Sequence, residues 1–225
     1  MNNPVSLVGI LAFATLLPFV LAAGSCFIKF SVVFSLLRNA IGLQQVPSNL
    51  AVQGLALIMT GFVMMPVADQ ATRYLREHAV RFDDAASTQA FLDQGLGAYR
   101  DYLARYADPS LVTYFAQLQA RRDMPDDAPP PVAGANTDPQ QASLFVLLPA
   151  YALSELKSAF RIGFYLYLPF LVVDMLVSNI LLALGMMMMS PITIALPIKL
   201  ILFVALDGWS EVTRGLLSQY LPLTH

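Results

Sequence analysis

Residues Leu182 to Trp209 read LALGMMMMSPITIALPIKLILFVALDGW, with four methionines between a glycine and a Ser-Pro pair. The stretch predicts the tip of a hairpin of two long apolar segments, with Met186 to Met189 at the turn. Methionine is unbranched, flexible and polarizable, so several copies brought together can close an irregular gap and still rearrange. The run therefore suggests a seal. Ordinary packing between apolar helices is the alternative interpretation.

The composition of the whole chain indicates a membrane protein. Of its 225 residues, 57% are hydrophobic and 12% are charged, whereas roughly a quarter of the residues in an ordinary soluble protein are charged. Three stretches carry no charged side chain, and each equals or exceeds the ~20 apolar residues that cross a bilayer as a helix. They lie between Met1 and Lys29, between Arg38 and Asp69, and between Asp174 and Lys199.

We therefore expect an all-α fold of membrane-type helical hairpins, with about four long apolar helices. Residues 69 to 140 hold 7 basic and 11 acidic side chains, which marks a polar insert. The expected parts are an N-terminal hairpin at 1–68, a helical insert at 69–122, a Pro-rich flexible linker at 123–143 and a C-terminal hairpin at 144–225.

Within these parts, hydrophobic periodicity and helix-breaking residues predict the individual helices. The first hairpin comprises Val5 to Leu37, kinked at Pro18, and Leu50 to Val67, capped by Ser48 or Asn49. The insert comprises Asp69 to Phe82, Thr88 to Tyr106 and Ser110 to Arg122. The last part comprises Leu144 to about Tyr167, a bend at Pro169, a span to Met189, a return over Pro191 to Leu206, and an amphipathic piece from Asp207 to Tyr220.

Several classes of function receive no support from the residue content. Net charge is −2 with no basic patch, so no nucleic-acid partner is proposed. One cysteine, Cys26, excludes a disulfide within the chain, and two histidines cannot form a metal cluster with it, so neither metal nor cofactor is expected. The N-terminal apolar run lacks the basic flank of a secretory signal and is interpreted as a retained helix. Arg38, with Lys157 and Arg161, favours a cytoplasmic first connector and an outer position for the insert.

Ionisable groups inside apolar segments are costly unless they are paired or face a polar interior. Eight such residues stand out: Lys29, Glu155, Lys157, Arg161, Asp174, Lys199, Asp207 and Glu211. A hairpin centred near Met189 would leave Asp174 and Lys199 about five residues, or ~8 Å, apart in depth, so no direct pair is expected. We therefore predict partners on neighbouring subunits. The alternative is that these side chains sit at interfaces and reach toward water.

Two motifs carry a resemblance to a known family. PAYALSELKSAFRIGF at Pro149 to Phe164, followed by PFLVVD at Pro169 to Asp174, resembles the paired signature of the FliP/SctR family. The similarity extends over Leu182 to Trp209 and over KFSVVFSLLRNAIGLQQVPSN at Lys29 to Asn49, and it leaves out the insert and linker. The variant LLRNAIGLQQVPSN is more similar to the R-type proteins of virulence injectisomes than to the flagellar branch.

The resemblance implies a core subunit of a type III secretion export gate, with no enzymatic activity. Such proteins form a ring of five copies that joins two other small membrane proteins, of the S and T types. The gate belongs to the bacterial inner membrane and is assembled largely at the periplasmic level of the basal body. Secreted proteins pass through its centre, and Met186 to Met189 of each copy would form a gasket. The insert is expected to form an outer collar.

Two other functions remain as alternatives. A self-contained ion or solute transporter would use Asp174 and Lys199 as coupling residues. An intramembrane enzyme is disfavoured because the chain has no HExxH, no GxSxG and no credible pair of catalytic carboxylates.

Overall fold

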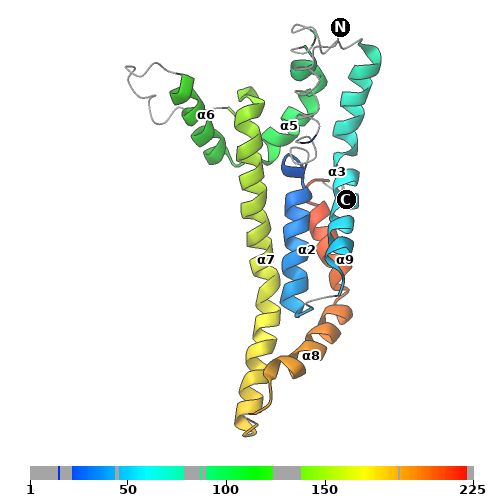
Figure 1. Cartoon of the computed structure of the whole chain (residues 1–225), viewed down its shortest axis with the longest axis vertical. Coiled ribbons are helices and arrows are strands. Elements are labelled where there is room, and N and C mark those ends of the chain that lie inside the picture. The colour runs from blue at the N-terminus through cyan, green and yellow to red at the C-terminus, as the bar shows by residue number, and fades with distance from the viewer. Residues whose placement is uncertain are drawn as a thin grey trace. The chain divides into compact units, whose positions relative to one another are not determined.

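The computed structural model of the chain describes residues 15, 22–43, 46–78, 87, 90–123, 138–186 and 188–221. Regular secondary structure within these ranges is entirely helical, which confirms the all-α class (Figure 1). About half of the expected segment from Val5 to Leu37, including Pro18, lies outside the described residues. The same holds for most of the Pro-rich linker and for Met187.

Seven α-helices and two short helical turns are described. They are α2 (Phe27–Ile41), α3 (Asn49–Glu77), the π-helical turn η1 (Phe91–Gly95), α5 (Gly97–Tyr106), α6 (Pro109–Asp123), the 3₁₀ turn η2 (Pro139–Gln141), α7 (Leu144–Ala183), α8 (Pro191–Ala205) and α9 (Gly208–Leu217). The helices expected over Ser110 to Arg122 and over Pro191 to Leu206 are confirmed as α6 and α8. Ser48 also caps α3 as expected, because its Oγ accepts a hydrogen bond from the Ala51 amide at 3.2 Å.

Two expected boundaries are wrong. α3 continues past Val67 into the polar sequence as far as Glu77, and α7 continues through Pro169 as one helix of 40 residues. A change from apolar to polar composition does not end a helix when the residues of the more polar part, such as Ala, Arg, Leu and Glu, are themselves good helix formers. The composition marks where the surroundings of a helix change, not where the helix ends.

The chain divides into two compact units, which are described separately. The first unit comprises Met1–Ile28 and Met64–Leu156, and the second comprises Lys29–Val63 and Lys157–His225. The four-part division drawn from the sequence remains a proposal beside this division by contacts.

Phenolic hydrogen bonds organise the core of the first unit. Tyr102 of α5 and Tyr151 of α7 share a hydrogen bond of 2.6 Å in the interior, and the Tyr99 hydroxyl donates to the Gly24 carbonyl at 3.0 Å. Burial raises the pKa of Tyr99 to about 12 and also raises the pKa of Tyr102, so both phenols stay protonated at neutral pH. The Asp108 amide donates to the Ser154 hydroxyl at 2.7 Å, which connects the start of α6 to α7.

Apolar contacts among α2, α7, α8 and α9 hold the second unit together. Its main cluster consists of the buried residues Leu37, Ala40, Ile41, Phe170 and Phe203. The Trp209 ring meets the Phe203 ring edge-on at 5.5 Å between centroids. At Gly163, α7 passes so close to α2 that a Cβ would lie 2.2 Å from Leu36 Cδ1. A smaller cluster, Val177, Leu181 and Ala195, closes the α7–α8 hairpin.

Two described helices, α3 and α7, are long and apolar enough to cross a membrane. α8 and α9 together supply a third span only if they are counted as one element bent by 58°. The sequence predicts about four membrane-spanning helices, whereas the described residues contain two or three. The 15 residues of α2 are too few for a span by themselves.

Candidate functional site

The methionine turn is built by a specific helix ending. Gly185, with a φ of 73°, takes the left-handed conformation that ends α7. The Met186 amide donates to the Leu181 carbonyl and the Gly185 amide donates to the Leu182 carbonyl, both at 3.0 Å. This pair of bonds is the Schellman motif, which favours glycine at its left-handed position. Pro191 then begins α8, where its missing amide hydrogen is not needed.

The described methionines of this turn point away from the chain's own core. Met188 is 100% exposed, while Met186 and Met189 are 40% and 44% exposed. Packing of the turn within a single chain is therefore not what holds these side chains. Their role in a seal remains a prediction.

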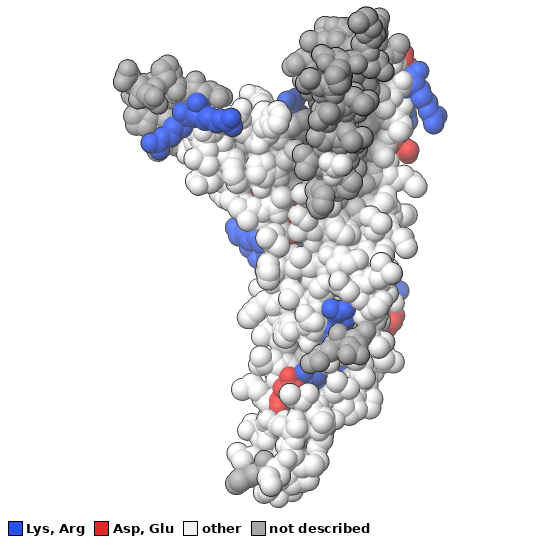
Figure 2. Space-filling view, viewed as in Figure 1, with Lys and Arg blue, Asp and Glu red and all other residues white. Residues whose placement is uncertain are grey.

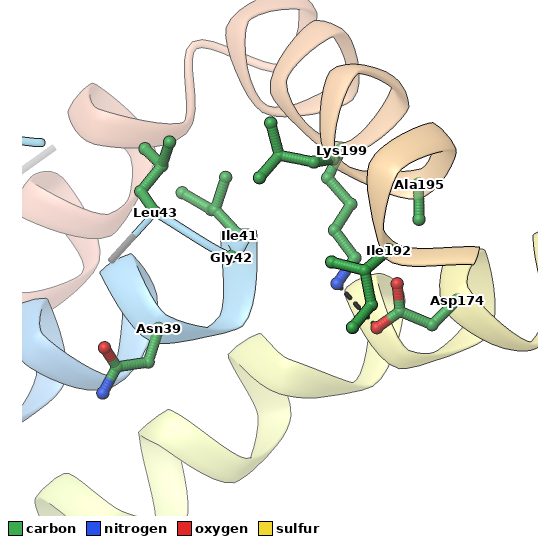
Figure 3. Close-up of a pocket in the computed structure, with 9 residues that line it drawn as sticks. Asn39, Ile41, Gly42, Leu43, Asp174, Ile192, Ala195 and Lys199 are labelled. Atoms are coloured by element: carbon green, nitrogen blue, oxygen red, sulfur yellow. Dashed lines mark hydrogen bonds and ion pairs between the residues drawn. The ribbon is translucent and has the colours of Figure 1, made fainter. Parts of the chain in front are cut away.

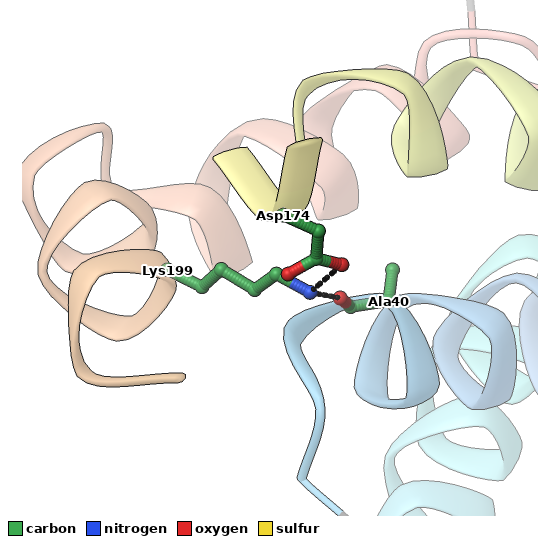
Figure 4. A network of polar contacts seen from close by, with 3 residues as sticks. All are labelled: Ala40, Asp174 and Lys199. Atoms are coloured by element: carbon green, nitrogen blue, oxygen red, sulfur yellow. Dashed lines mark hydrogen bonds and ion pairs between the residues drawn. The ribbon is translucent and has the colours of Figure 1, made fainter. Parts of the chain in front are cut away.

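Asp174 and Lys199 form an ion pair within the α7–α8 hairpin, contrary to the expectation that they would not meet. Lys199 Nζ lies 2.6 Å from Asp174 Oδ2 and also donates to the Ala40 carbonyl of α2 at 3.2 Å (Figure 4). The Lys199 side chain is 9% exposed and that of Asp174 is 49% exposed. The buried ammonium is thus satisfied by the carboxylate and by the C-terminal end of α2, where helix carbonyls favour a cation.

The position of the turn explains why Asp174 and Lys199 meet. α7 ends at Ala183 and α8 begins at Pro191, so the hairpin is centred on position 187, not 189. Moving the centre by two residues shifts the level opposite Asp174 by four residues, from Val204 to Leu200. Lys199 then lies next to the level position and reaches the carboxylate.

A pocket of about 370 Å³ lies beside this ion pair (Figure 3). It is formed where the C-terminal end of α2 meets the hairpin. Its apolar lining comes from both elements and comprises Ile41, Leu43, Ile192, Ala195 and Leu196. Asn39, Asp174 and Lys199 supply its polar groups.

Lys29 is the other deeply buried lysine, at 4% exposure. Its Nζ donates to Gln219 Oε1 at 3.3 Å and lies 4.6 Å from the centre of the Tyr220 ring. That ring also meets Phe30 edge-on at 5.7 Å. Gln219 and Tyr220 could not be recognised from the sequence as partners of this lysine, because nothing in a linear pattern relates residues about 190 positions apart.

The remaining predicted charges differ widely in exposure. Glu155 is 2% exposed, whereas Lys157 and Arg161 are exposed on α7. Glu211 and Arg214, three residues apart on α9, form an exposed ion pair of 3.2 Å. Asp207, with a φ of 47°, lies at the bend between α8 and α9. Figure 2 shows how sparse charged side chains are on one face of the molecule. The described residues contain no group of three or more His, Cys, Asp or Glu side chains placed to hold a metal ion.

Apolar helices of membrane-spanning length, a half-buried ion pair and an exposed methionine turn together define a helical membrane protein. Comparison with known proteins is more specific. Residues 10–216 match the FliP family, and the chain belongs to this family.

Similar proteins cover almost the whole chain. The surface presentation of antigens protein SpaP of Salmonella typhimurium is 53% identical over 99% of both chains. The Yop proteins translocation protein R of Yersinia pestis is 44% identical over 97% of both. The harpin secretion protein HrpW of Pseudomonas syringae pv. syringae is 39% identical over 92% of this chain and 96% of its own.

Proposed function

We propose that this chain is a non-enzymatic core subunit of the export gate of a type III secretion apparatus in the bacterial inner membrane. Copies of the chain, five in the expected ring, would join S-type and T-type membrane proteins at the periplasmic level of the basal body. Secreted proteins would pass through the centre. Membership of the FliP family and relatives named for secretion and translocation support this proposal.

The observation that carries the proposal is the exposed methionine turn. Met188 is fully exposed at the end of an apolar hairpin. A large apolar side chain is stable in that position when a neighbouring surface covers it. Repeated by symmetry, such turns place flexible, polarizable side chains around one axis, where they can close the gate against ions and yield to a passing chain.

The embedded charges would serve the contacts between subunits. Lys157 and Arg161 are exposed on α7, and Asp174 is half exposed after pairing with Lys199. We assign inter-subunit roles to these three residues and to the exposed Asp207 and Glu211. The other predicted charges, Lys29, Glu155 and Lys199, are nearly buried within the chain and are not available for such contacts in this structure. An ionised group at a lipid-free interface can find a partner there that lipid cannot provide.

The proposal is tested by replacing Met186, Met187, Met188 and Met189 together with alanine. We expect the assembled complex to form normally, as measured by native mass spectrometry, and ion conductance across the inner membrane to rise. The matched control is the double substitution Met64→Ala and Met65→Ala on α3, which removes methionines that include one 60% exposed. Conductance unchanged in the first variant, or raised equally in both, would contradict the seal.

A second function, transport by the isolated chain, is favoured by one observation. An aspartate and a lysine meet inside an apolar hairpin, an arrangement that can couple ion and solute movement. Purified chain in liposomes would then move a solute, and Asp174→Asn would stop it. The gate proposal expects no transport by the chain alone.

A further inference from the structure

The pocket beside the ion pair has an acidic group, Asp174, that can accept hydrogen bonds from a cationic ligand. Asp174 Oδ2 accepts from Lys199, and among the described residues no other side chain donates to this carboxylate. A carboxylate offers about four lone-pair sites, so its second oxygen can accept further donors. Because the side chain is 49% exposed, that capacity is open to a molecule outside the chain.

The surroundings of the carboxylate also favour a cation. α2 ends beside the pocket, and the last carbonyls of a helix carry partial negative charge. One of them, that of Ala40, already binds Lys199. The Lys199 ammonium is 9% exposed and therefore offers little surface to an anion. Figure 3 shows Asp174 facing the Lys199 ammonium beside Ile192, while the Asn39 side chain points away from them.

The size and lining of the pocket define the shape of the group that it accepts. A volume of about 370 Å³ lies within the ~300–1,000 Å³ range of ligand pockets. Ile192 and Leu196 would contact an aliphatic stem, while the carboxylate would bind a charged end. Lysine and arginine side chains have this combination of an apolar stem and a cationic head.

We propose that this pocket binds the lysine or arginine side chain of an apolar helix from another protein of the gate. The bound ammonium or guanidinium forms a second ion pair with Asp174, so that this carboxylate joins Lys199 within the chain to a cation outside it. The proposal rests on the proposed function for the identity of the partner, but not for the chemistry of the pocket.

Butylguanidinium is a probe of that chemistry. The full-length chain, purified in detergent with ¹³C-labelled isoleucine methyl groups, is titrated while the methyl spectra are recorded. We expect saturable shifts of Ile41 and Ile192, and an affinity at least about tenfold lower in Asp174→Asn, since a charged hydrogen bond is lost. Butylurea, an uncharged analogue of similar shape, should bind at least about tenfold more weakly. Equal binding of the two compounds would overturn the proposal.

Two further variants separate loss of the site from loss of the fold. Ile192→Trp fills the pocket from a position that is 71% exposed, while leaving the ion pair in place. It should abolish the shift of Ile41. Ile180→Trp, on α7 and 58% exposed, does not line the pocket and should leave binding unchanged. Butylguanidinium binding that persists in Ile192→Trp would overturn the assignment.

The assembled complex tests the identity of the occupant. A photoreactive amino acid at position 192, with position 180 as control, is activated in membranes, and the cross-linked peptides are sequenced. We expect a peptide from another gate protein with one lysine or arginine between apolar residues. A cross-linked peptide without a basic residue, or one from a second copy of this chain, would overturn the assignment of the occupant. The seal experiment reads conductance, so each proposal can fail without the other.

Discussion

Two buried lysines are tolerated in this apolar chain because each ammonium has specific partners. Lys199 has a carboxylate and a helix carbonyl, and Lys29 has an amide oxygen and an aromatic face. An ammonium taken out of water without such partners costs several kcal/mol. Apart from Asp174, the partners of the two lysines are groups that a sequence pattern alone does not mark.

The Asp174–Lys199 pair should respond unequally to loss of its two members. Asp174→Asn leaves a nearly buried ammonium without its counter-charge, so we expect a loss of about 2 kcal/mol in the free energy of unfolding. Lys199→Met leaves a half-exposed carboxylate that water can reach, so we expect a loss below about 1 kcal/mol. Unfolding of the purified chain in detergent and denaturant measures both. Equal losses would show that the two charges are equally buried.

The exposed pair supplies the control for this comparison. Arg214 and Glu211 side chains are 72% and 65% exposed. Glu211→Gln and Arg214→Met should each change the free energy of unfolding by less than about 0.5 kcal/mol, because solvent screens exposed pairs.

Tyr220 should stabilise the second unit through its ring. Tyr220→Leu removes the contact with the Lys29 ammonium and the edge-on contact with Phe30, so we expect unfolding to become easier by about 1–3 kcal/mol. Tyr220→Phe keeps the ring and should lose clearly less. Tyr165→Leu is the control, since Tyr165 is 63% exposed. Equal effects of the two Tyr220 variants, measured by denaturant unfolding, would assign the contribution to the hydroxyl.

Glycines set how closely the helices approach. A Cβ at Gly163 would meet Leu36 Cδ1 at 2.2 Å and Leu36 Cβ at 3.3 Å, so the contact of α7 with α2 depends on the missing side chain. Gly163→Ala should destabilise the chain by about 1–3 kcal/mol. Gly54→Ala on α3 meets nothing within 4 Å and should stabilise it by about 0.5–1 kcal/mol through helix propensity. Thermal unfolding in detergent compares the two, and a stabilised Gly163→Ala would contradict the close contact.

The elements that sequence predicts well are those defined by local signals. Ser48 caps α3, and Gly185 with Pro191 bounds the methionine turn, because caps and turns depend on residues a few positions apart. The turn and its methionines could therefore be recognised without a structure. The lengths of the helices could not be predicted in this way. α3 continues through Pro66 and into polar sequence, and α7 continues through Pro169, without ending.

The ion pair shows why the remaining contacts of the site could not be predicted from the sequence. An offset of two residues in the centre of a hairpin moves facing positions by four, which is more than a turn of helix. Asp174 and Lys199 both stand out in the sequence as ionisable residues within apolar segments, yet whether they pair depends on this register. The contacts of Lys199 with Ala40 and of Lys29 with Tyr220 depend further on tertiary packing, which no local rule encodes.

At the scale of the whole chain, apolar surface is the main unsatisfied feature. Large side chains that include Leu57, Ile58 and Phe62 on α3, and Leu171, Met175 and Leu176 on α7, are 48% to 73% exposed. Monomeric soluble proteins rarely expose contiguous patches of this kind. Lipid or other proteins must cover them, which agrees with a subunit of a larger membrane assembly.

Substitution of Gly61 tests whether protein or lipid covers the exposed apolar face of α3. It is exposed on α3 next to Phe62, and a Cβ there would meet nothing within 4 Å in the chain itself. Small residues let helices of different chains approach closely in membranes. Gly61→Leu should therefore leave the unfolding of the isolated chain nearly unchanged but reduce the assembled complex severalfold in native mass spectrometry. Gly215→Leu on α9, also open in the chain, is the matched control. Normal assembly of Gly61→Leu would indicate that this face of α3 meets lipid or lies at a loosely packed interface.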